Sequence, residues 1–80
     1  MLQVGLKGKK IVVVTTENTA ERMLSGLLPV YATPSLIAFM EYTCSETVQP
    51  FLDDGMGTVG TLVNIKHTSA SPVGSTITCE

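Results

Sequence analysis

The chain has 80 residues, of which 44% are hydrophobic and only 15% are charged, and its formal net charge is −2. This length allows one domain at most, and so apolar a composition in a small domain indicates surface reserved for an interface or for chain that is missing here. Lys7, Lys9 and Lys10 form a basic cluster that is too small to predict a nucleic-acid partner. No stretch approaches the roughly 20 apolar residues of a membrane helix, so we expect no membrane partner.

The cysteines and the N-terminus together predict the compartment. The longest apolar run near the start, residues 11–14, is too short for the core of a secretory signal. Cys44 and Cys79 have neither a metal-ligand spacing nor a CxxC pattern, which favours buried free thiols. One histidine and scattered acids also make no metal-ligand set. We therefore expect a soluble cytoplasmic protein without a metal.

The first part of the chain predicts one strand and one short helix. Residues 9–16 are rich in β-branched side chains and are bounded by Gly8 and Asn18, as is typical of a strand. Asn18 with Glu21 three residues later is a capping-box pattern, which predicts a short helix over residues 19–24. An apolar connector broken by Pro29 follows.

The longest predicted element is a helix from Pro34 to about Gln49. Thr33 is a good N-cap, Pro34 suits the first helical position, and Pro50 prevents continuation. Apolar side chains recur on one face of this helix, at Leu36, Ile37, Met40, Cys44 and Val48. A single carboxylate, Glu41, lies on the flank of that face, and a carboxylate in such a place needs a partner or a task.

Residues 59–70 change to a period of two, which predicts a strand. Val63, Ile65 and His67 share the face that we expect to turn toward the helix, whereas a slip of one residue would turn His67 outward. A turn over residues 71–74 leads to a further strand that begins at residue 75. The order strand, short helix, long helix, strand, strand predicts an α+β domain.

Three polar residues stand where they could carry chemistry: Thr33, Glu41 and His67. Glu41 and His67 could meet if the helix packs on the strand, and a carboxylate can then orient the imidazole or act as base or nucleophile. The N–H groups at the helix start could hold an anion or a developing oxyanion, and Gly60 would let the backbone approach a ligand. Structural roles stay open for each: Thr33 as a cap, Glu41 in an ion pair, and His67 as a hydrogen-bonded core residue.

The run VYATPSLIAFMEYTC, residues 30–44, and the run GTVGTLVNIKHTSASPVG, residues 57–74, resemble hot-dog-fold thioesterases of the fluoroacetyl-CoA thioesterase type. An A-T-(P/G) helix start, an M-E in the long helix and a G-T…H-x-(S/A)-A-(T/S)-P-x-G strand and turn recur in that family at this spacing. The resemblance covers roughly residues 4–80. It implies the N-terminal portion of one hot-dog domain over residues 1–80, with a long helix packed on an antiparallel sheet. Because the family continues for several more strands, we expect the sequence to be a fragment.

By position, the resemblance implies that Thr33, Glu41 and His67 are catalytic and that the backbone of Gly60 lies along the acyl group. The implied reaction is hydrolysis of a small acyl-CoA thioester. Glu41 would act as nucleophile or general base, His67 would assist proton transfer, and Thr33 would orient the thioester or the carboxylate. Coenzyme A enters as part of the substrate, no cofactor is implied, and the active sites lie at the interface of a homodimer.

Two alternatives remain on the same fold. The first is a module that binds acyl-CoA without cleaving it. The second is a dehydratase or hydratase, whose acid and histidine usually share one loop and strand. The nearest acid before His67 is Asp54, on the far side of a glycine-rich loop, so we rank this alternative last.

Overall fold

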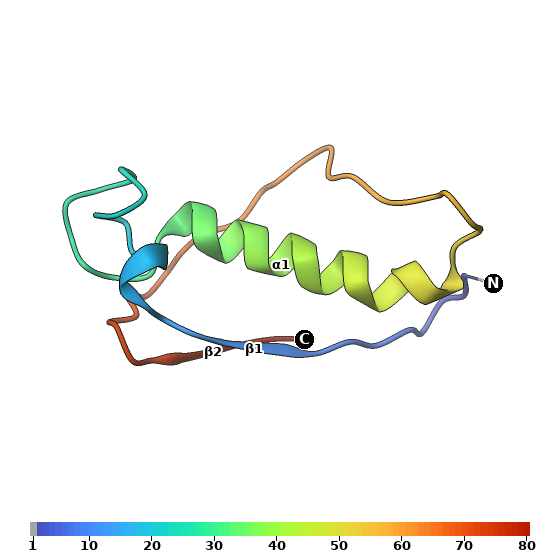
Figure 1. The fold of residues 1–80 in the computed structure, drawn as a ribbon, viewed down its shortest axis with the longest axis horizontal. Helices are drawn as coiled ribbons and strands as arrows, with labels where there is room; N and C mark the ends of the chain where they lie inside the picture. The colour runs from blue at the N-terminus through green and yellow to red at the C-terminus, as the bar shows by residue number, and fades with distance from the viewer. Residues whose placement is uncertain (1) are drawn as a thin grey trace.

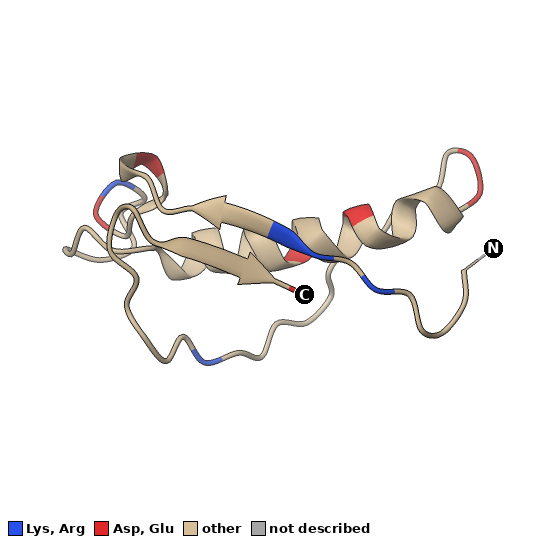
Figure 2. Cartoon of the chain, turned by 90° about the horizontal axis from the view of Figure 1, so that it is seen from below, with Lys and Arg blue, Asp and Glu red and all other residues tan. Residues whose placement is uncertain are grey.

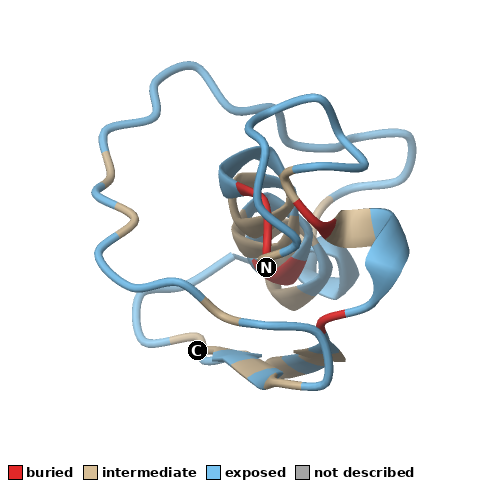
Figure 3. Ribbon diagram, turned by 90° about the vertical axis from the view of Figure 1, so that its left-hand side faces the viewer, coloured by how far each residue is buried: buried red, intermediate tan, exposed pale blue. Residues whose placement is uncertain are grey.

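A helix of 16 residues, α1 (Thr33–Val48), forms the axis of the computed structural model, which describes residues 2–80 and measures 43 × 22 × 21 Å. Strands β1 (Lys10–Val13) and β2 (Thr76–Cys79) form a two-stranded antiparallel sheet on one side of α1 (Figure 1). Two short 3₁₀ helices, η1 (Thr16–Asn18) and η2 (Gln49–Phe51), follow β1 and α1. Residues 57–70, here called segment 57–70, pass along a side of α1 that the sheet leaves uncovered (Figures 1 and 3). This arrangement confirms the predicted long helix on an antiparallel sheet.

The sheet forms where β-branched residues were expected to form strands. Lys10 pairs with Cys79 and Val13 with Thr76, so each strand is shorter than predicted. Half-buried and exposed residues alternate along both strands, as they do when one face of a sheet packs on a helix. Beyond β1, Val14 is 1% exposed, and its carbonyl accepts a hydrogen bond of 2.9 Å from the N–H of Gly74. The sheet therefore closes at the turn before β2.

Helix α1 begins one residue earlier than predicted. Ala32 occupies the N-cap position, and the N–H of Leu36 donates to its carbonyl over 3.0 Å. The prediction of Thr33 as the N-cap is therefore wrong, because Thr33 is the first helical residue. At the other end the helix stops at Val48, close to the predicted end, and the chain continues as η2.

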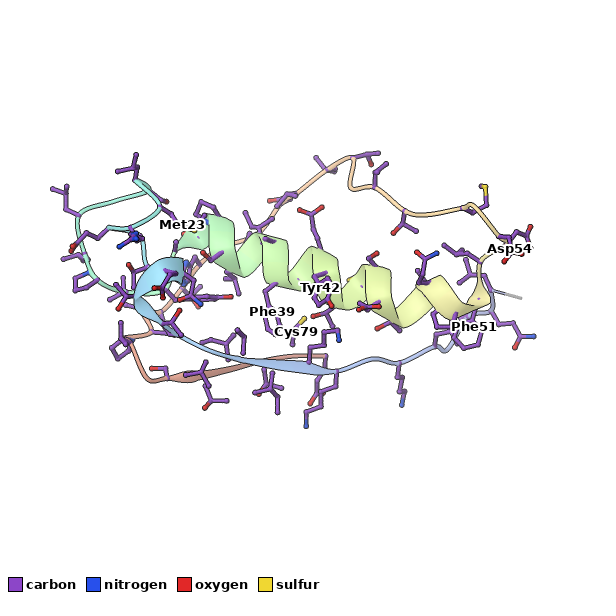
Figure 4. All side chains as sticks on the ribbon, viewed as in Figure 1. Met23, Phe39, Tyr42, Phe51, Asp54 and Cys79 are labelled. Atoms are coloured by element: carbon purple, nitrogen blue, oxygen red, sulfur yellow. The ribbon has the colours of Figure 1, made fainter. Side chains whose placement is uncertain are left out.

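The predicted apolar face of α1 does not form one buried surface. Thr43 is the one residue of the helix that is buried, and Phe39 points from the helix toward the sheet (Figure 4). Cys44 lies on a different side and is exposed, whereas Cys79 is half-buried. Both thiols are free, as predicted, but the expected burial of Cys44 is wrong because the sheet covers another face of the helix.

The predicted short helix over residues 19–24 is absent. The side chain of Asn18 accepts a hydrogen bond from the N–H of Thr15 over 2.9 Å, so Asn18 forms a capping box with Thr15, the N-cap residue of η1. Thr19 then pairs with Tyr31 in an isolated bridge, and the N–H of Ala20 donates to the carbonyl of Val30 over 2.7 Å. Residues 20–24 are therefore a turn.

The predicted strand over residues 59–70 is also absent from the part of the chain that the structure describes. A strand needs a neighbour for its backbone N–H and C=O groups, and the sheet lies elsewhere around α1. The period of two is visible in the burial at the end of the segment, where Ile65 and His67 are half-buried and Lys66 is exposed. Val63, which we expected on the same inward face, is exposed. His67 thus turns inward, as predicted, without a strand.

The charged side chains are sparse. Lys7, Lys9 and Lys10 follow one another along the approach to β1 and its first residue (Figure 2). Lys9 lies 3.9 Å from Glu80 in an exposed ion pair, and the ammonium of Lys10 lies 5.0 Å from the centre of the Tyr42 ring. Over residues 2–80, no helix has the length and apolarity that a membrane crossing requires.

Candidate active site

The hydroxyl of Thr33 and the imidazole of His67 are in hydrogen-bond contact, with 2.8 Å between Thr33 Oγ1 and His67 Nδ1. Thr33 is the first residue of α1, and His67 belongs to segment 57–70. The imidazole tautomer determines which atom donates. A hydroxyl beside an imidazole is an arrangement in which a proton can be taken from, or returned to, an oxygen atom. Thr33 is exposed and His67 half-buried, so a ligand can reach the pair.

Backbone hydrogen bonds of Tyr31 and Ala32 fix the position of this pair. The N–H of Tyr31 donates to the carbonyl of Ser71 over 2.8 Å, and the N–H of Ala32 donates to the carbonyl of Asn18 over 2.9 Å. Tyr31 is 3% exposed and Ala32 is 0% exposed. The start of α1 is therefore tied both to the stretch after His67 and to the end of η1.

The side chain of Tyr31 supports the same helix turn. Its hydroxyl donates to the carbonyl of Ser35 over 3.2 Å. Burial raises the pKa of this phenol above its usual value, and the nearby Cys79 adds to the effect. The phenol therefore keeps its proton and can act as a donor. Sequence reasoning missed Tyr31, although a hydroxyl-bearing aromatic residue just before the A-T-P helix start was a visible signal.

Glu41 meets segment 57–70 further along the helix, at Gly60. A Cβ atom on Gly60 would lie 2.6 Å from Glu41 Oε2, which is closer than such atoms can approach. The backbone at residue 60 therefore passes directly against the carboxylate, and only glycine leaves that carboxylate in place. Glu41 itself is exposed.

An open groove of about 860 Å³ separates α1 from segment 57–70, and both Glu41 and Gly60 line it. Much of the remaining lining is apolar and includes Ile37, Met40, Val48, Val63 and Ile65. A smaller pocket of about 230 Å³ at the helix start contains Thr33 and His67. The two polar parts of the site therefore lie in two neighbouring hollows along one side of α1.

The structure does not bring Glu41 and His67 together. No hydrogen bond or ion pair between them is present among residues 2–80; His67 contacts Thr33, and Glu41 contacts Gly60. A straight helix rises about 1.5 Å per residue, which separates Thr33 from Glu41 by about 12 Å. Because α1 is continuous from Thr33 to Val48, a bent helix start does not close this gap.

The helix start presents part of the predicted anion site. Pro34 has no N–H group, and the N–H of Leu36 already donates to Ala32. The N–H groups of Thr33 and Ser35 have no acceptor within the part of the chain that the structure describes, and these groups can bind an oxygen with partial negative charge. Within residues 2–80, no three His, Cys, Asp or Glu side chains gather closely enough for a metal ion.

Comparison with known proteins connects this geometry to one family. The family model of the fluoroacetyl-CoA-specific thioesterase FlK matches residues 14–80. The chain belongs to this family. The fluoroacetyl-CoA thioesterase of Streptantibioticus cattleyicolor is 39% identical over 49 residues, which are 61% of this chain and 35% of that protein.

Solved structures of this thioesterase share the fold of the chain. One matches with a TM-score of 0.88 and 28% identity over 98% of this chain and 62% of its own. A mutant in complex with fluoroacetate and CoA matches with a TM-score of 0.80 and 29% identity, over 88% of this chain and 59% of its own. The chain thus has the hot-dog fold of the family, and it spans about three fifths of the length of these solved relatives.

Proposed function

We propose that this protein is an acyl-CoA thioesterase, in which Thr33, Glu41 and His67 carry the reaction. The observation that carries this proposal is the hydrogen bond of 2.8 Å between Thr33 and His67, beside a groove whose wall includes a carboxylate. Solved relatives include a complex with fluoroacetate and CoA and a mutant complex with acetyl-CoA. Coenzyme A would enter as part of the substrate, and the reaction uses no cofactor of its own.

In this mechanism the thioester carbonyl gains a nucleophile and loses the CoA sulfur. Glu41 either takes a proton from a water molecule that attacks the carbonyl carbon or attacks that carbon itself, which gives an anhydride that water then opens. The carbon–sulfur bond breaks, the CoA thiolate leaves with its electron pair, and His67 returns a proton to the sulfur. Thr33 orients the thioester, while the N–H groups of the helix start stabilise the oxyanion. The products are a carboxylate and free CoA.

The site we propose is shared between two copies of the chain. Thr33 lies about 12 Å along the helix from Glu41, and His67 contacts Thr33. One carbonyl group therefore cannot contact all three side chains in one chain. A symmetric homodimer with two equivalent sites would bring Glu41 of one copy to the Thr33 and His67 pair of its partner. Exposed apolar side chains such as Leu24, Leu27 and Leu28 support an interface of this kind.

We also propose that the protein works in the cytoplasm. Free cysteines are the rule in that reducing compartment, and both cysteines of this chain are free. The exposed thiol of Cys44 in particular would be open to oxidation elsewhere.

The decisive experiment measures release of CoA from acyl-CoA substrates by chromatography, because the exposed Cys44 would itself react with a thiol reagent. We expect the Glu41→Gln variant to lose about 10²-fold or more of the rate, as the removal of a general base or nucleophile does. Glu46→Gln is the matched control, since Glu46 is an exposed carboxylate of the same helix that contacts Tyr42. Hydrolysis by Glu41→Gln at the wild-type rate would refute the proposed mechanism.

A second candidate function is the binding of acyl-CoA without turnover. The separation of Glu41 from His67 favours it, because an acid and a base that do not converge on one atom cannot share one reaction. The same assay decides between the two functions. With wild-type protein, a binding module would bind acyl-CoA but release no CoA from it.

A further inference from the structure

Segment 57–70 has an unpaired backbone along the side of α1. Among residues 2–80, no backbone N–H or C=O group of this segment bonds to another backbone group. The segment also runs clear of β1 and β2 (Figures 1 and 3). Its burial alternates over residues 65–67, as it does in a strand. Extended chain with an unpaired backbone can accept a neighbouring strand.

The side chains of the segment favour contact with another protein surface. Val59 and Leu62 are 89% and 85% exposed, and Val63 is 49% exposed. Lys66 is the only Lys, Arg, Asp or Glu of the segment, which also contains no proline. Natural sheets protect their free edges from pairing with charged side chains and prolines. Segment 57–70 has little such protection.

We propose that segment 57–70 is the dimer interface, where two copies of the segment pair antiparallel about a two-fold axis near Val63 and Asn64. The inference rests on the shared site of the proposed function and adds the surface that forms it. A second copy fits this surface because its own segment has the same unpaired backbone and the same exposed aliphatic side chains. Neither copy brings a charged side chain to the axis.

The position of the axis follows from two contacts inside one chain. Glu41 meets the segment at Gly60, and Thr33 meets it at His67. The midpoint between the two contacts therefore lies near Ile37 on α1 and between residues 63 and 64 on the segment. A two-fold axis through these midpoints, perpendicular to the helix, exchanges the levels of the two contacts. Glu41 of one copy then stands level with the Thr33 and His67 pair of its partner.

This arrangement removes the separation that exists within one chain. Along α1 the carboxylate and the pair are about 12 Å apart, whereas across the axis their offset along the helix disappears. Paired strands lie about 4.8 Å apart, so Gly60 of one copy comes next to His67 of its partner. Because Gly60 has no side chain, the space between the carboxylate and that imidazole stays open to a substrate.

Crosslinking of single cysteines on the intact protein tests the axis. In a background in which Cys44 and Cys79 are serine, Val63→Cys and Val59→Cys each react with a short bifunctional thiol reagent. Across the proposed axis the two copies of residue 63 lie about 6 Å apart, and those of residue 59 lie about 30 Å apart. We expect Val63→Cys to give a covalent dimer, and Val59→Cys, the matched control, to remain monomeric on a denaturing gel.

Two charge variants test the same contact without a reagent. Val63→Lys places two ammonium groups near the axis, and Val63→Glu places two carboxylates there. Each should raise the dissociation constant of the dimer by about tenfold or more, because like charges on facing strands repel. An equimolar mixture should restore the dimer mass, measured by light scattering, because opposite charges then face each other. Circular dichroism checks that both variants keep the wild-type helix content.

The outcomes separate this interface from the proposed function. A dimer that crosslinks at residue 63 and releases no CoA would support the interface and refute the thioesterase. A dimer that releases CoA but crosslinks at residue 59, or at neither residue, would overturn the interface and leave the thioesterase standing. A monomeric protein would also overturn the interface, and CoA release by that monomer would leave hydrolysis within one chain.

Discussion

The hydroxyl of Thr33 does not cap α1, because the helix begins at Thr33 and the N-cap position falls on Ala32. An N-cap threonine uses its oxygen to accept a backbone N–H of the first turn, whereas the first helical residue has no such duty. Here Ala32 takes the N-cap position and its side chain contributes no capping bond. That missing bond costs the helix about 1 kcal/mol relative to a polar cap. The hydroxyl of Thr33 is then available to His67.

Gly60 gives a prediction at the scale of one methyl group. In Gly60→Ala the new Cβ would lie 2.6 Å from Glu41 Oε2, so the carboxylate must move, which a flexible side chain can do at little cost in stability. We expect CoA release to fall by about tenfold or more, because a general base displaced from its target loses most of its effect, while the melting temperature changes little.

The control for this substitution is Gly57→Ala, at a glycine of the same segment where an added Cβ meets nothing within 4 Å. It should leave both activity and stability unchanged. If Gly60→Ala retains full activity, the carboxylate of Glu41 is not held in a productive position by the backbone of residue 60.

Tyr31 gives a prediction about the start of α1. Tyr31→Phe removes the hydroxyl that donates to Ser35 and should lower the free energy of unfolding by about 1 kcal/mol, the usual net value of such a bond. Tyr42→Phe is the matched control, because Tyr42 is exposed and its hydroxyl contacts Glu46 at the surface. Thermal melts of both variants at neutral pH make the comparison.

The raised pKa of Tyr31 also predicts the response to alkali. Because burial raises the pKa of the folded phenol, the unfolded chain loses this proton first as the pH rises. The stabilisation is fully present below about pH 10, the ordinary pKa of tyrosine, and is lost as the pH passes through the folded value. Wild-type protein should therefore melt at a lower temperature above pH 10, and Tyr31→Phe should lose less. Equal losses in both proteins would remove Tyr31 from this account.

The elements that the sequence predicts correctly are those with a local cause. Pro34 and Pro50 set the bounds of α1 to within a residue or two, and the β-branched runs locate β1 and β2. The errors arise where the partner is distant. Asn18 bonds backward to Thr15 instead of forward, and segment 57–70 has strand periodicity without a neighbouring strand among the described residues.

In the candidate site, the identities of the residues were predictable but their contacts were not. Resemblance identified Thr33, Glu41, His67 and Gly60, and the structure places all four along one side of α1. Which of these residues contact each other could not be predicted from the sequence. The contacts depend on the rise per residue of segment 57–70 along the helix axis. That advance puts His67 beside Thr33 and Gly60 beside Glu41, whereas the sequence suggested a contact between Glu41 and His67.

The whole molecule buries few apolar side chains for its length. Val14, Tyr31 and Ala32 form the buried apolar core of residues 2–80, while Leu24 and Leu27 are each 93% exposed. We expect the 80-residue chain as a monomer, outside the dimer in which the variants above are compared, to melt without a sharp cooperative transition and to bind a dye such as ANS, as chains with loosely packed apolar surface do. Circular dichroism and fluorescence measure both. A sharp melt from a monomer would contradict this prediction.

Assembly gives the last prediction. If one site combines Glu41 of one copy with Thr33 and His67 of its partner, a mixture of Thr33→Ala and Glu41→Gln chains contains dimers with one intact site. Those mixed dimers should regain up to about half of the wild-type activity per dimer, since one of two equivalent sites is whole, whereas each parent alone stays inactive.

Light scattering on wild-type protein provides the companion measurement, with the mass of a dimer as the expected result. The two variants are unfolded and refolded together so that the chains exchange, and Glu41→Gln treated alone in the same way is the control. A monomeric mass, or no recovery on mixing, would rule out shared sites of this kind.

The exposed thiol of Cys44 allows the accessibility of the groove to be measured as a reaction rate. Cys44 lies on the groove wall, and Cys79, the other free thiol, is half-buried beneath the helix. A thiol-disulfide reagent should therefore modify Cys44 first, at a rate set by how freely the reagent enters the groove. A molecule bound in the groove would slow the modification of Cys44. The slower modification of Cys79 would serve as an internal reference rate. The ratio of the two modification rates therefore reports whether the groove is occupied, and its measurement needs no substrate turnover.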